Sequence, residues 1–152
     1  MLDTVQRCRF DATIAALSYW APSIADVARI VEIECESSWT IAVTPEEPTA
    51  CPFELRLRHD GHYRLAIAGE VYDDLPIETY ELFVPLAQAI AAGNVCRRLW
   101  FSRLTGLLRG VGTVVELGAD RTWSAERQLS GLPPTDPEDV IATDHYFAPF
   151  RR

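Results

Sequence analysis

The sequence predicts an α+β fold: one mostly antiparallel sheet of about six or seven strands built from hairpins, with a short N-terminal helix and one long helix (about 78–92) packed on one face. Three observations predict it. Several short segments alternate apolar and polar residues, which is the period of a half-buried strand. Short connections join these segments, as in antiparallel hairpins. Two other segments carry apolar residues at helical spacing.

The two predicted helices differ in length. Residues 11–20 read as a short helix in which Asp11 is the N-cap. In 78–92, apolar residues recur every three or four positions, and Gly93 is suited to follow the C-terminus of a helix. Pro85 lies inside this segment, so it either kinks the helix or marks a restart in its first turn.

The first predicted hairpin joins residues 31–35 to residues 39–43. A three-residue connection places all of its large apolar side chains on one face, because directly opposed residues share a face. The expected pairs are Cys35 with Trp39, Ile33 with Ile41 and Val31 with Val43. Glu32 and Glu34 are then expected on the solvent-facing side.

The stretch RLRHDGHYRL (56–65) offers two interpretations, a metal site at His59 and His62 or the tip of a second hairpin. A two-residue turn would place the two apolar stripes on opposite faces, so a three-residue loop over 59–61 is favoured. In that loop Gly61 can take a positive φ. The expected pairs are Leu57 with Tyr63, Leu55 with Leu65 and Phe53 with Ile67. A neighbouring arginine disfavours a metal cation, so the structural interpretation is preferred.

Three further strands are predicted over 95–104, 111–117 and 121–128. The turn between the first two falls either at residues 105–106 or near residue 110. Residues 1–130 are interpreted as a single α+β domain. Residues 131–152 are interpreted as an irregular loop followed by an aromatic tail that docks on the domain.

Composition restricts the class of protein. The chain has 152 residues, a formal net charge of −8 and 14 basic residues, all of them arginine. Such a charge disfavours binding to nucleic acid and to anionic membranes. No apolar run is long enough to span a membrane and no secretory signal is visible, so a cytoplasmic location is expected. The four cysteines show no C-x-x-C spacing and are interpreted as small buried apolar residues.

No motif assigns a reaction to the chain. Gly106, Gly110 and Gly112 lack the spacing of a phosphate-binding loop and precede a strand, so turns or bulges are expected to explain them. The adjacent pair Asp144 and His145 is weak evidence for a base and its orienting carboxylate. No catalytic residue, metal ligand or cofactor is therefore assigned.

The segment RRLWFSR is the most informative local feature, and Arg97, Arg98, Trp100 and Arg103 are its candidate partner-binding residues. Its composition is typical of an interface hot spot. The structural interpretation, which is preferred, is that these arginines complement Glu32, Glu34 and other carboxylates across the same sheet. A platform for single-stranded nucleic acid is a further alternative, which the net charge disfavours. Large apolar groups fall on both faces of this strand. We therefore expect the tail or a second protein chain to cover the face that bears Arg98 and Trp100.

Two functions follow. The first is a non-catalytic protein that binds a protein partner or itself, as an adaptor, immunity protein, chaperone or regulatory subunit. The alternative is a small-molecule or enzymatic pocket between a curved sheet and the long helix, lined by Trp39, Tyr63, Tyr80 and Trp123. In size, acidity and element order the chain resembles small secretion chaperones and immunity proteins, which favours the first.

Overall fold

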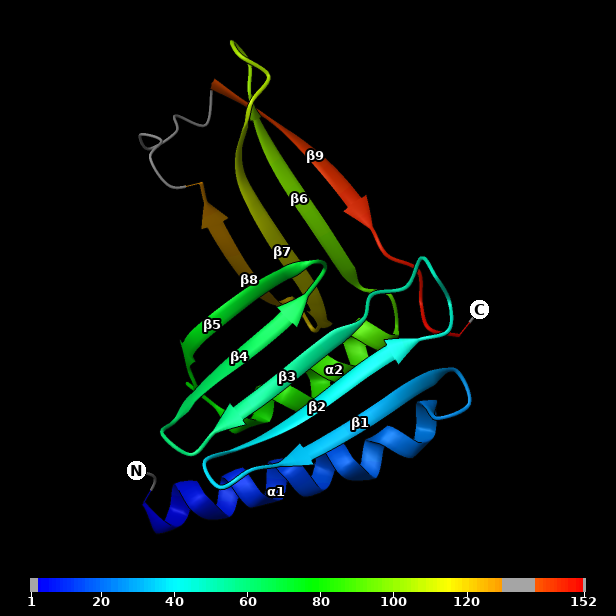
Figure 1. Cartoon of the computed structure of the whole chain (residues 1–152), viewed down its shortest axis with the longest axis vertical. Helices are drawn as coiled ribbons and strands as arrows, with labels where there is room; N and C mark the ends of the chain where they lie inside the picture. The colour runs from blue at the N-terminus through cyan, green and yellow to red at the C-terminus, as the bar shows by residue number, and fades with distance from the viewer. Residues whose placement is uncertain (1–2, 130–138, 152) are drawn as a thin grey trace.

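A computed structural model describes residues 3–129 and 139–151, which form two antiparallel sheets and two α-helices. The first sheet has five strands that pair in chain order. They are β1 (Ala28–Glu34), β2 (Ser38–Pro45), β3 (Phe53–Arg58), β4 (His62–Ile67) and β5 (Glu70–Pro76). Both helices lie against one face of this sheet (Figure 1).

The second sheet has four strands in the order β8-β7-β6-β9 and projects from the side of the first (Figure 1). Its strands are β6 (Val95–Ser102), β7 (Leu108–Gly118), β8 (Arg121–Gln128) and β9 (Val140–Tyr146). The α+β class is confirmed, whereas the prediction of one sheet of six or seven strands is wrong. The chain enters helix α2 after β5, and β6 then starts a new set of pairings instead of extending the first sheet.

The N-terminal helix α1 spans Thr4–Trp20 and is longer than predicted. It begins well before Asp11 because Asp3 is its N-cap. The Asp3 carboxylate accepts a hydrogen bond from the Gln6 backbone N–H at 2.8 Å, and the Gln6 side chain accepts one from the Asp3 N–H at 3.2 Å. This reciprocal capping box satisfies two backbone donors that an α-helix otherwise leaves unpaired. A short 3₁₀ turn (Ala21–Ile24) follows, with proline near its start.

The predicted long helix is shorter than expected. A 3₁₀ turn (Tyr80–Leu82) precedes α2, which spans only Phe83–Ala91. Pro85 lies in the first turn of α2, where its missing N–H is tolerated, so the restart interpretation is the one observed. Gly93 follows the helix with a φ of +84°, as its position predicted.

The second hairpin is confirmed. Leu57 pairs with Tyr63, Leu55 with Leu65 and Phe53 with Ile67. All six side chains are at most 5% exposed. Gly61 has a φ of +83° in the loop between the strands.

The register predicted for the first hairpin is wrong by one residue. Glu34 pairs with Trp39, Glu32 with Ile41 and Ile30 with Val43. Only Glu36 and Ser37 lie in the loop, because Cys35 N donates to Ser38 O at 2.8 Å. A loop shorter by one residue turns β1 over, so Val31 and Ile33 lie on the outer face and are 39% and 50% exposed.

The two sheets meet where β4 and β5 approach β6, β7 and β8. The Trp123 indole N–H donates to the Tyr63 hydroxyl at 2.8 Å, and the Tyr72 hydroxyl lies 2.9 Å from the Thr113 hydroxyl. Glu70, 9% exposed, accepts from Arg127 at 3.0 Å. These buried polar contacts fix how one sheet lies on the other, because an unpaired polar group in such a junction is costly.

The C-terminal segment is more regular than predicted. Residues 140–146 form β9, which pairs antiparallel with β6, so the prediction of an irregular tail is wrong there. After β9, Phe147 N donates to Val95 O at 3.2 Å and Phe150 N donates to Ala91 O at 2.9 Å. The Phe150 ring is 4% exposed and joins the core beside α2.

The division into a domain over 1–130 and a docked tail over 131–152 stays a prediction, since residues 130–138 lie outside the described residues. Among the residues that are described, no helix is long and apolar enough to cross a membrane.

Candidate functional site

The second sheet has one covered face and one open face. Val111, Thr113, Val115 and Trp123 lie on the covered face, and each is at most 6% exposed. Successive strand residues point to opposite sides, so Arg98 and Trp100 lie on the other face. We call this surface the Trp100 face. The cross-strand pairing assigns to it Arg98, Trp100, Gly110, Gly112, Glu126, Gln128, Ala142 and Asp144.

The Trp100 ring lies across two glycines of the neighbouring strand β7. A Cβ atom built on Gly112 would come within 2.7 Å of the Trp100 Cη2 atom, and one on Gly110 would lie 3.4 Å from its Cε3 atom. Any larger residue at position 112 would therefore push the indole off the sheet. The glycines allow the ring to lie flat on the sheet, so the Trp100 side chain is half-buried.

The indole also lines a groove of about 380 Å³. Its walls come from β8 on one side and β9 on the other, and its contributors include Trp100, Gly110, Glu126, Gln128, Val140 and Ala142. The lining combines the aromatic ring with a carboxylate, an amide and two arginines, Arg109 and Arg127. An apolar or planar group can therefore stack on the indole while polar groups bond at the rim.

Beside Trp100, Arg98 and Asp144 form a two-point ion pair. Arg98 Nε donates to Asp144 Oδ1 at 2.7 Å and Nη2 donates to Oδ2 at 2.9 Å. The hydrogen bond from Arg98 holds the pKa of the Asp144 carboxyl below its ordinary value, and the carboxylate raises the pKa of Arg98. The pair holds β9 against β6 and keeps the guanidinium in one orientation on the Trp100 face.

The four predicted partner-binding residues do not all lie together. Arg98 and Trp100 share the Trp100 face, whereas Arg97 points to the covered face, where its Nη2 lies 3.5 Å from Glu70 Oε1. Arg103 lies in the exposed turn after β6, and its backbone N–H donates to Asp139 O at 2.9 Å. The expected pairing of these arginines with carboxylates across the same sheet is observed for Arg98, which binds Asp144 of β9. The part of that prediction that named Glu32 and Glu34 is wrong, because they belong to the other sheet.

Three of the four predicted pocket residues are part of the packed core. Trp39, Tyr63 and Trp123 are 4%, 5% and 6% exposed. Tyr63 packs edge-on against Phe83 of α2 with ring centroids 5.0 Å apart. Burial raises the pKa of the Tyr63 hydroxyl, which accepts the Trp123 hydrogen bond. These side chains are therefore packed in the core and do not line an open pocket: Tyr63 lies against α2 and Trp123 lies at the junction of the two sheets.

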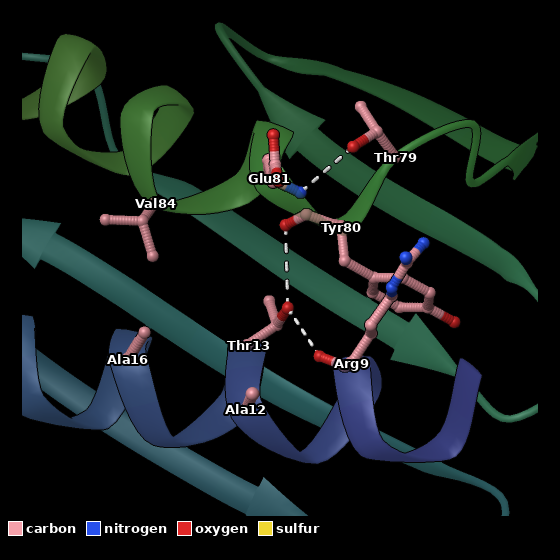
Figure 2. Close-up of a pocket in the computed structure, with 8 residues that line it drawn as sticks. All are labelled: Arg9, Ala12, Thr13, Ala16, Thr79, Tyr80, Glu81 and Val84. Carbon is pink, nitrogen blue, oxygen red and sulfur yellow. Dashed lines mark hydrogen bonds between the residues drawn. The ribbon is translucent and has the colours of Figure 1, made fainter. Parts of the chain in front are cut away.

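Tyr80, the fourth, lines a groove of about 370 Å³ between α1 and α2 (Figure 2). Figure 2 shows the Thr13 hydroxyl between the Arg9 and Tyr80 carbonyl oxygens, at 2.8 and 3.5 Å. Ala12 and Ala16 form its lower wall and present no polar side chain. The Thr13 hydroxyl thus links α1 to the 3₁₀ turn that precedes α2.

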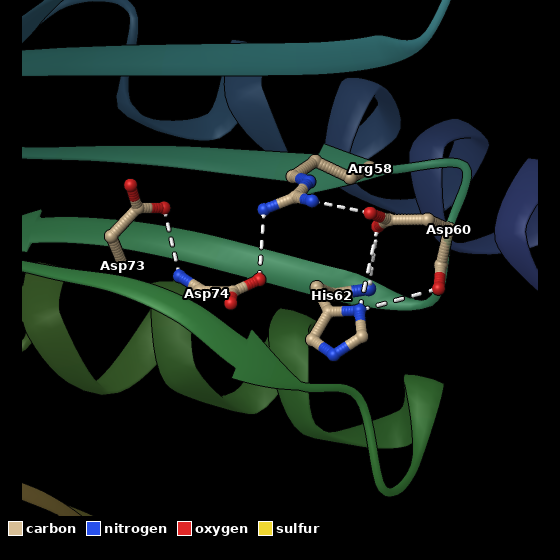
Figure 3. A network of polar contacts seen from close by, with 5 residues as sticks. All are labelled: Arg58, Asp60, His62, Asp73 and Asp74. Atoms are coloured by element: carbon tan, nitrogen blue, oxygen red, sulfur yellow. Dashed lines mark hydrogen bonds and ion pairs between the residues drawn. The ribbon is translucent and has the colours of Figure 1, made fainter.

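The hairpin tip that suggested a metal site is instead a network of ion pairs (Figure 3). Arg58 binds Asp60 in the loop and, at 3.1 Å, Asp74 of β5. The His62 backbone N–H donates to Asp60 Oδ1 at 3.2 Å. His59 points elsewhere and packs edge-on against Phe10 of α1, with centroids 4.8 Å apart. The two histidines therefore do not converge on one point.

Asp144 and His145 do not act as a pair either. They are consecutive strand residues and point to opposite faces. Asp144 is held by Arg98, and the His145 ring packs edge-on against Phe147 at 4.9 Å.

Within the described residues, no group of three histidine, cysteine or acidic side chains could hold a metal ion. All four cysteines are free. Cys51 and Cys96 are buried as predicted, and burial raises the pKa of Cys51 to about 11. Cys8 and Cys35 are exposed, which corrects the prediction for these two because their positions face outward on α1 and at the end of β1.

Several residues of the Trp100 face escaped the sequence interpretation. Gly110 and Gly112 were expected at turns or bulges. That holds for Gly106, which has a φ of +71° in the turn after β6, and Gly110 borders a bulge. Gly112 lies inside a regular strand opposite Arg98. Two glycines two residues apart in a strand, near a tryptophan-bearing strand, are the signal that could have indicated this packing.

Comparisons of the chain with known protein families, with curated proteins and with solved structures find no match.

Proposed function

We propose that this chain is a non-catalytic protein-binding protein, and that the Trp100 face is its binding surface. The observation that carries the proposal is the large indole held flat on an open sheet face by Gly112, whose Cβ position the ring occupies. A tryptophan beside an arginine on an accessible surface is the composition of an interface hot spot.

The position of the C-terminal tail supports this proposal, because the described part of the tail does not cover the Trp100 ring. Its described part pairs with β6 along the edge of the sheet, so β9 widens the Trp100 face. Phe147 and Phe150 bond near α2 instead. Tyr146 adds a second aromatic ring to the same face and is 70% exposed. Among the described residues the tail therefore leaves the Trp100 ring accessible, which supports a second polypeptide as the cover.

The small-molecule alternative has less support. It requires an open pocket lined by Trp39, Tyr63, Tyr80 and Trp123, and three of these four side chains are buried in the packed core. A non-catalytic role also agrees with the three histidines, since each is engaged with an aromatic ring or with a hairpin loop.

The test is affinity purification of partners from the native source with tagged wild-type protein and two variants. Trp100→Ala removes the indole, and Val71→Ala is the matched control because Val71 is an exposed apolar residue of the other sheet, 47% exposed. We expect one partner to be recovered with wild type and Val71→Ala and lost with Trp100→Ala. Thermal unfolding of each variant establishes that the fold is kept. Recovery of the same partner in equal amount with folded Trp100→Ala would overturn the proposal.

A second measurement locates the contact. Hydrogen exchange of the complex should show slower exchange in β6, β7 and β9 than in the free chain, while β1 to β4 stay unchanged. Protection confined to the first sheet would contradict the assignment to the Trp100 face.

A further inference from the structure

Strand β1 forms the free edge of the first sheet, and this edge is a second accessible surface. In the described residues β1 pairs with β2 alone. An unpaired edge strand presents a row of backbone N–H and C=O groups to any extended chain that approaches it.

The backbone bonds of the first hairpin identify which groups are presented. Cys35 N donates to Ser38 O, and Glu46 N donates to Val27 O. Hydrogen-bonded positions alternate along an antiparallel strand, so the odd-numbered residues of β1 bond to β2. The even-numbered residues direct their N–H and C=O groups away from the sheet. They are Ala28, Ile30, Glu32 and Glu34.

The side chains of β1 differ on its two faces. Val31 and Ile33 form an exposed apolar stripe on the outer face. On the inner face Glu32 and Glu34 are exposed, and neither is in an ion pair with another described residue. Sheets commonly protect edges with charge, and these two carboxylates repel acidic strands. They attract basic ones.

We propose that β1 accepts an extended segment of another polypeptide as a sixth strand, and that this segment alternates apolar with basic residues. Its backbone bonds to the four even-numbered residues of β1. Its apolar residues lie beside Val31 and Ile33 on the outer face, and its basic residues face Glu32 and Glu34.

The same features argue against a second copy of this chain as the occupant. Edge-to-edge pairing of two copies would bring the carboxylates of both β1 strands together, in chains that each carry a net charge of −8. The β8 edge is a weaker candidate because Arg121, Thr122, Ser124 and Glu126 make it polar and exposed.

The test uses a capped synthetic heptapeptide of alternating lysine and valine, the length of β1, added to the full-length protein. Amide hydrogen exchange by NMR should slow at Ala28, Ile30, Glu32 and Glu34 as the peptide is titrated, with no change on the Trp100 face. A peptide in which a central lysine is replaced by N-methyl-lysine keeps the charge but lacks a backbone N–H that faces β1, so it should bind more weakly.

Charge reversal makes the test specific. The variant Glu32→Lys/Glu34→Lys should weaken binding of the lysine–valine peptide by at least roughly tenfold and should bind a glutamate–valine peptide instead. The matched control, Glu116→Lys at an exposed position of β7, should leave the affinity unchanged. The proposal is overturned if the four edge amides stay unprotected at saturating peptide. It is also overturned if charge reversal leaves the preference for the lysine peptide intact. Neither result bears on Trp100, so the outcome is separate from that of the proposed function.

Discussion

The two sheets are built from the same antiparallel pairing but are covered in different ways. In the first sheet, β3 and β4 alternate buried and half-buried side chains, and helices cover the buried face. In the second, one face packs against β4 and β5, and the other carries a half-buried tryptophan that no described element covers. The difference teaches that a large apolar side chain on a sheet does not need a second layer when the neighbouring strand has glycines beneath it.

The largest expected effect concerns the segment that links the two sheets. Deleting residues 131–152 removes β9 from the second sheet and Phe150 from the core beside α2. We expect a loss of at least about 4 kcal/mol in the free energy of unfolding, since a buried phenylalanine alone contributes about 3–5 kcal/mol. Denaturant unfolding of full-length and truncated chains measures it.

The matched control removes only Arg151 and Arg152. The exposed pair between Arg151 and Asp26 is the interaction lost, and the midpoint should change little. An unchanged midpoint after the longer deletion would show that the tail does not stabilise either sheet.

A pair of leucines, one on the covered face of each sheet, tests how closely the two sheets are packed. Leu55 lies in the centre of β3 and is 1% exposed, whereas Leu99 occupies the equivalent place in β6 and is only half-buried. Leu55→Ala should cost about 3–5 kcal/mol and Leu99→Ala about 1–2 kcal/mol, because the cost follows the apolar area and cavity left behind. Equal losses in urea unfolding would mean that the second sheet is as closely packed as the first.

The glycine packing is tested by a double-mutant cycle. Gly112→Ala should destabilise the wild-type chain by about 1–3 kcal/mol, because the new Cβ displaces the Trp100 ring. In the Trp100→Ala background the same substitution should cost almost nothing, since the ring is absent. The cycle isolates the contact as the difference between the two losses. Additive losses would mean that Gly112 is needed for another reason.

The smallest effect is a pH dependence from the Arg98–Asp144 pair. Arg98 lowers the pKa of Asp144 in the folded state, so the pair stabilises the fold above the unfolded carboxyl pKa of about 3.9. This contribution is lost as the pH falls through the lower folded value. Asp144→Asn should therefore reduce the acid dependence of stability below about pH 4.

Thermal unfolding at several pH values measures that dependence, with Glu126→Gln as a control that removes a carboxylate from the same face. If Asp144→Asn and the control have the same acid dependence, the ion pair has no role in stability.

Local signals in the sequence were sufficient for some elements. The second hairpin could be predicted because Phe53, Leu55 and Leu57 admit a single register with the stripe on β4, and Gly61 permits the loop that this register needs. The start of α2 two residues before Pro85 and the glycine after its end follow from backbone restrictions that act within a few residues. For the candidate site, sequence alone indicated Arg98 and Trp100, because a segment that combines arginines with large aromatic residues stands out before any contact in space is known.

Tertiary structure decided the rest. In the first hairpin Val31 and Ile33 form a more continuous apolar stripe than Ile30 alone, so the hydrophobic pattern predicts that they face the core. A two-residue loop turns them outward instead, and the hydrophobic pattern does not indicate the length of a loop. Strand β9 has little alternation and is a strand because β6 offers it an edge. The sequence determined which segments have strand or helix character and which residues stand out. Only the packing of distant segments decided that there are two sheets, that Gly112 makes room for Trp100, and that β1 has a free edge, because those facts depend on contacts far apart in the chain.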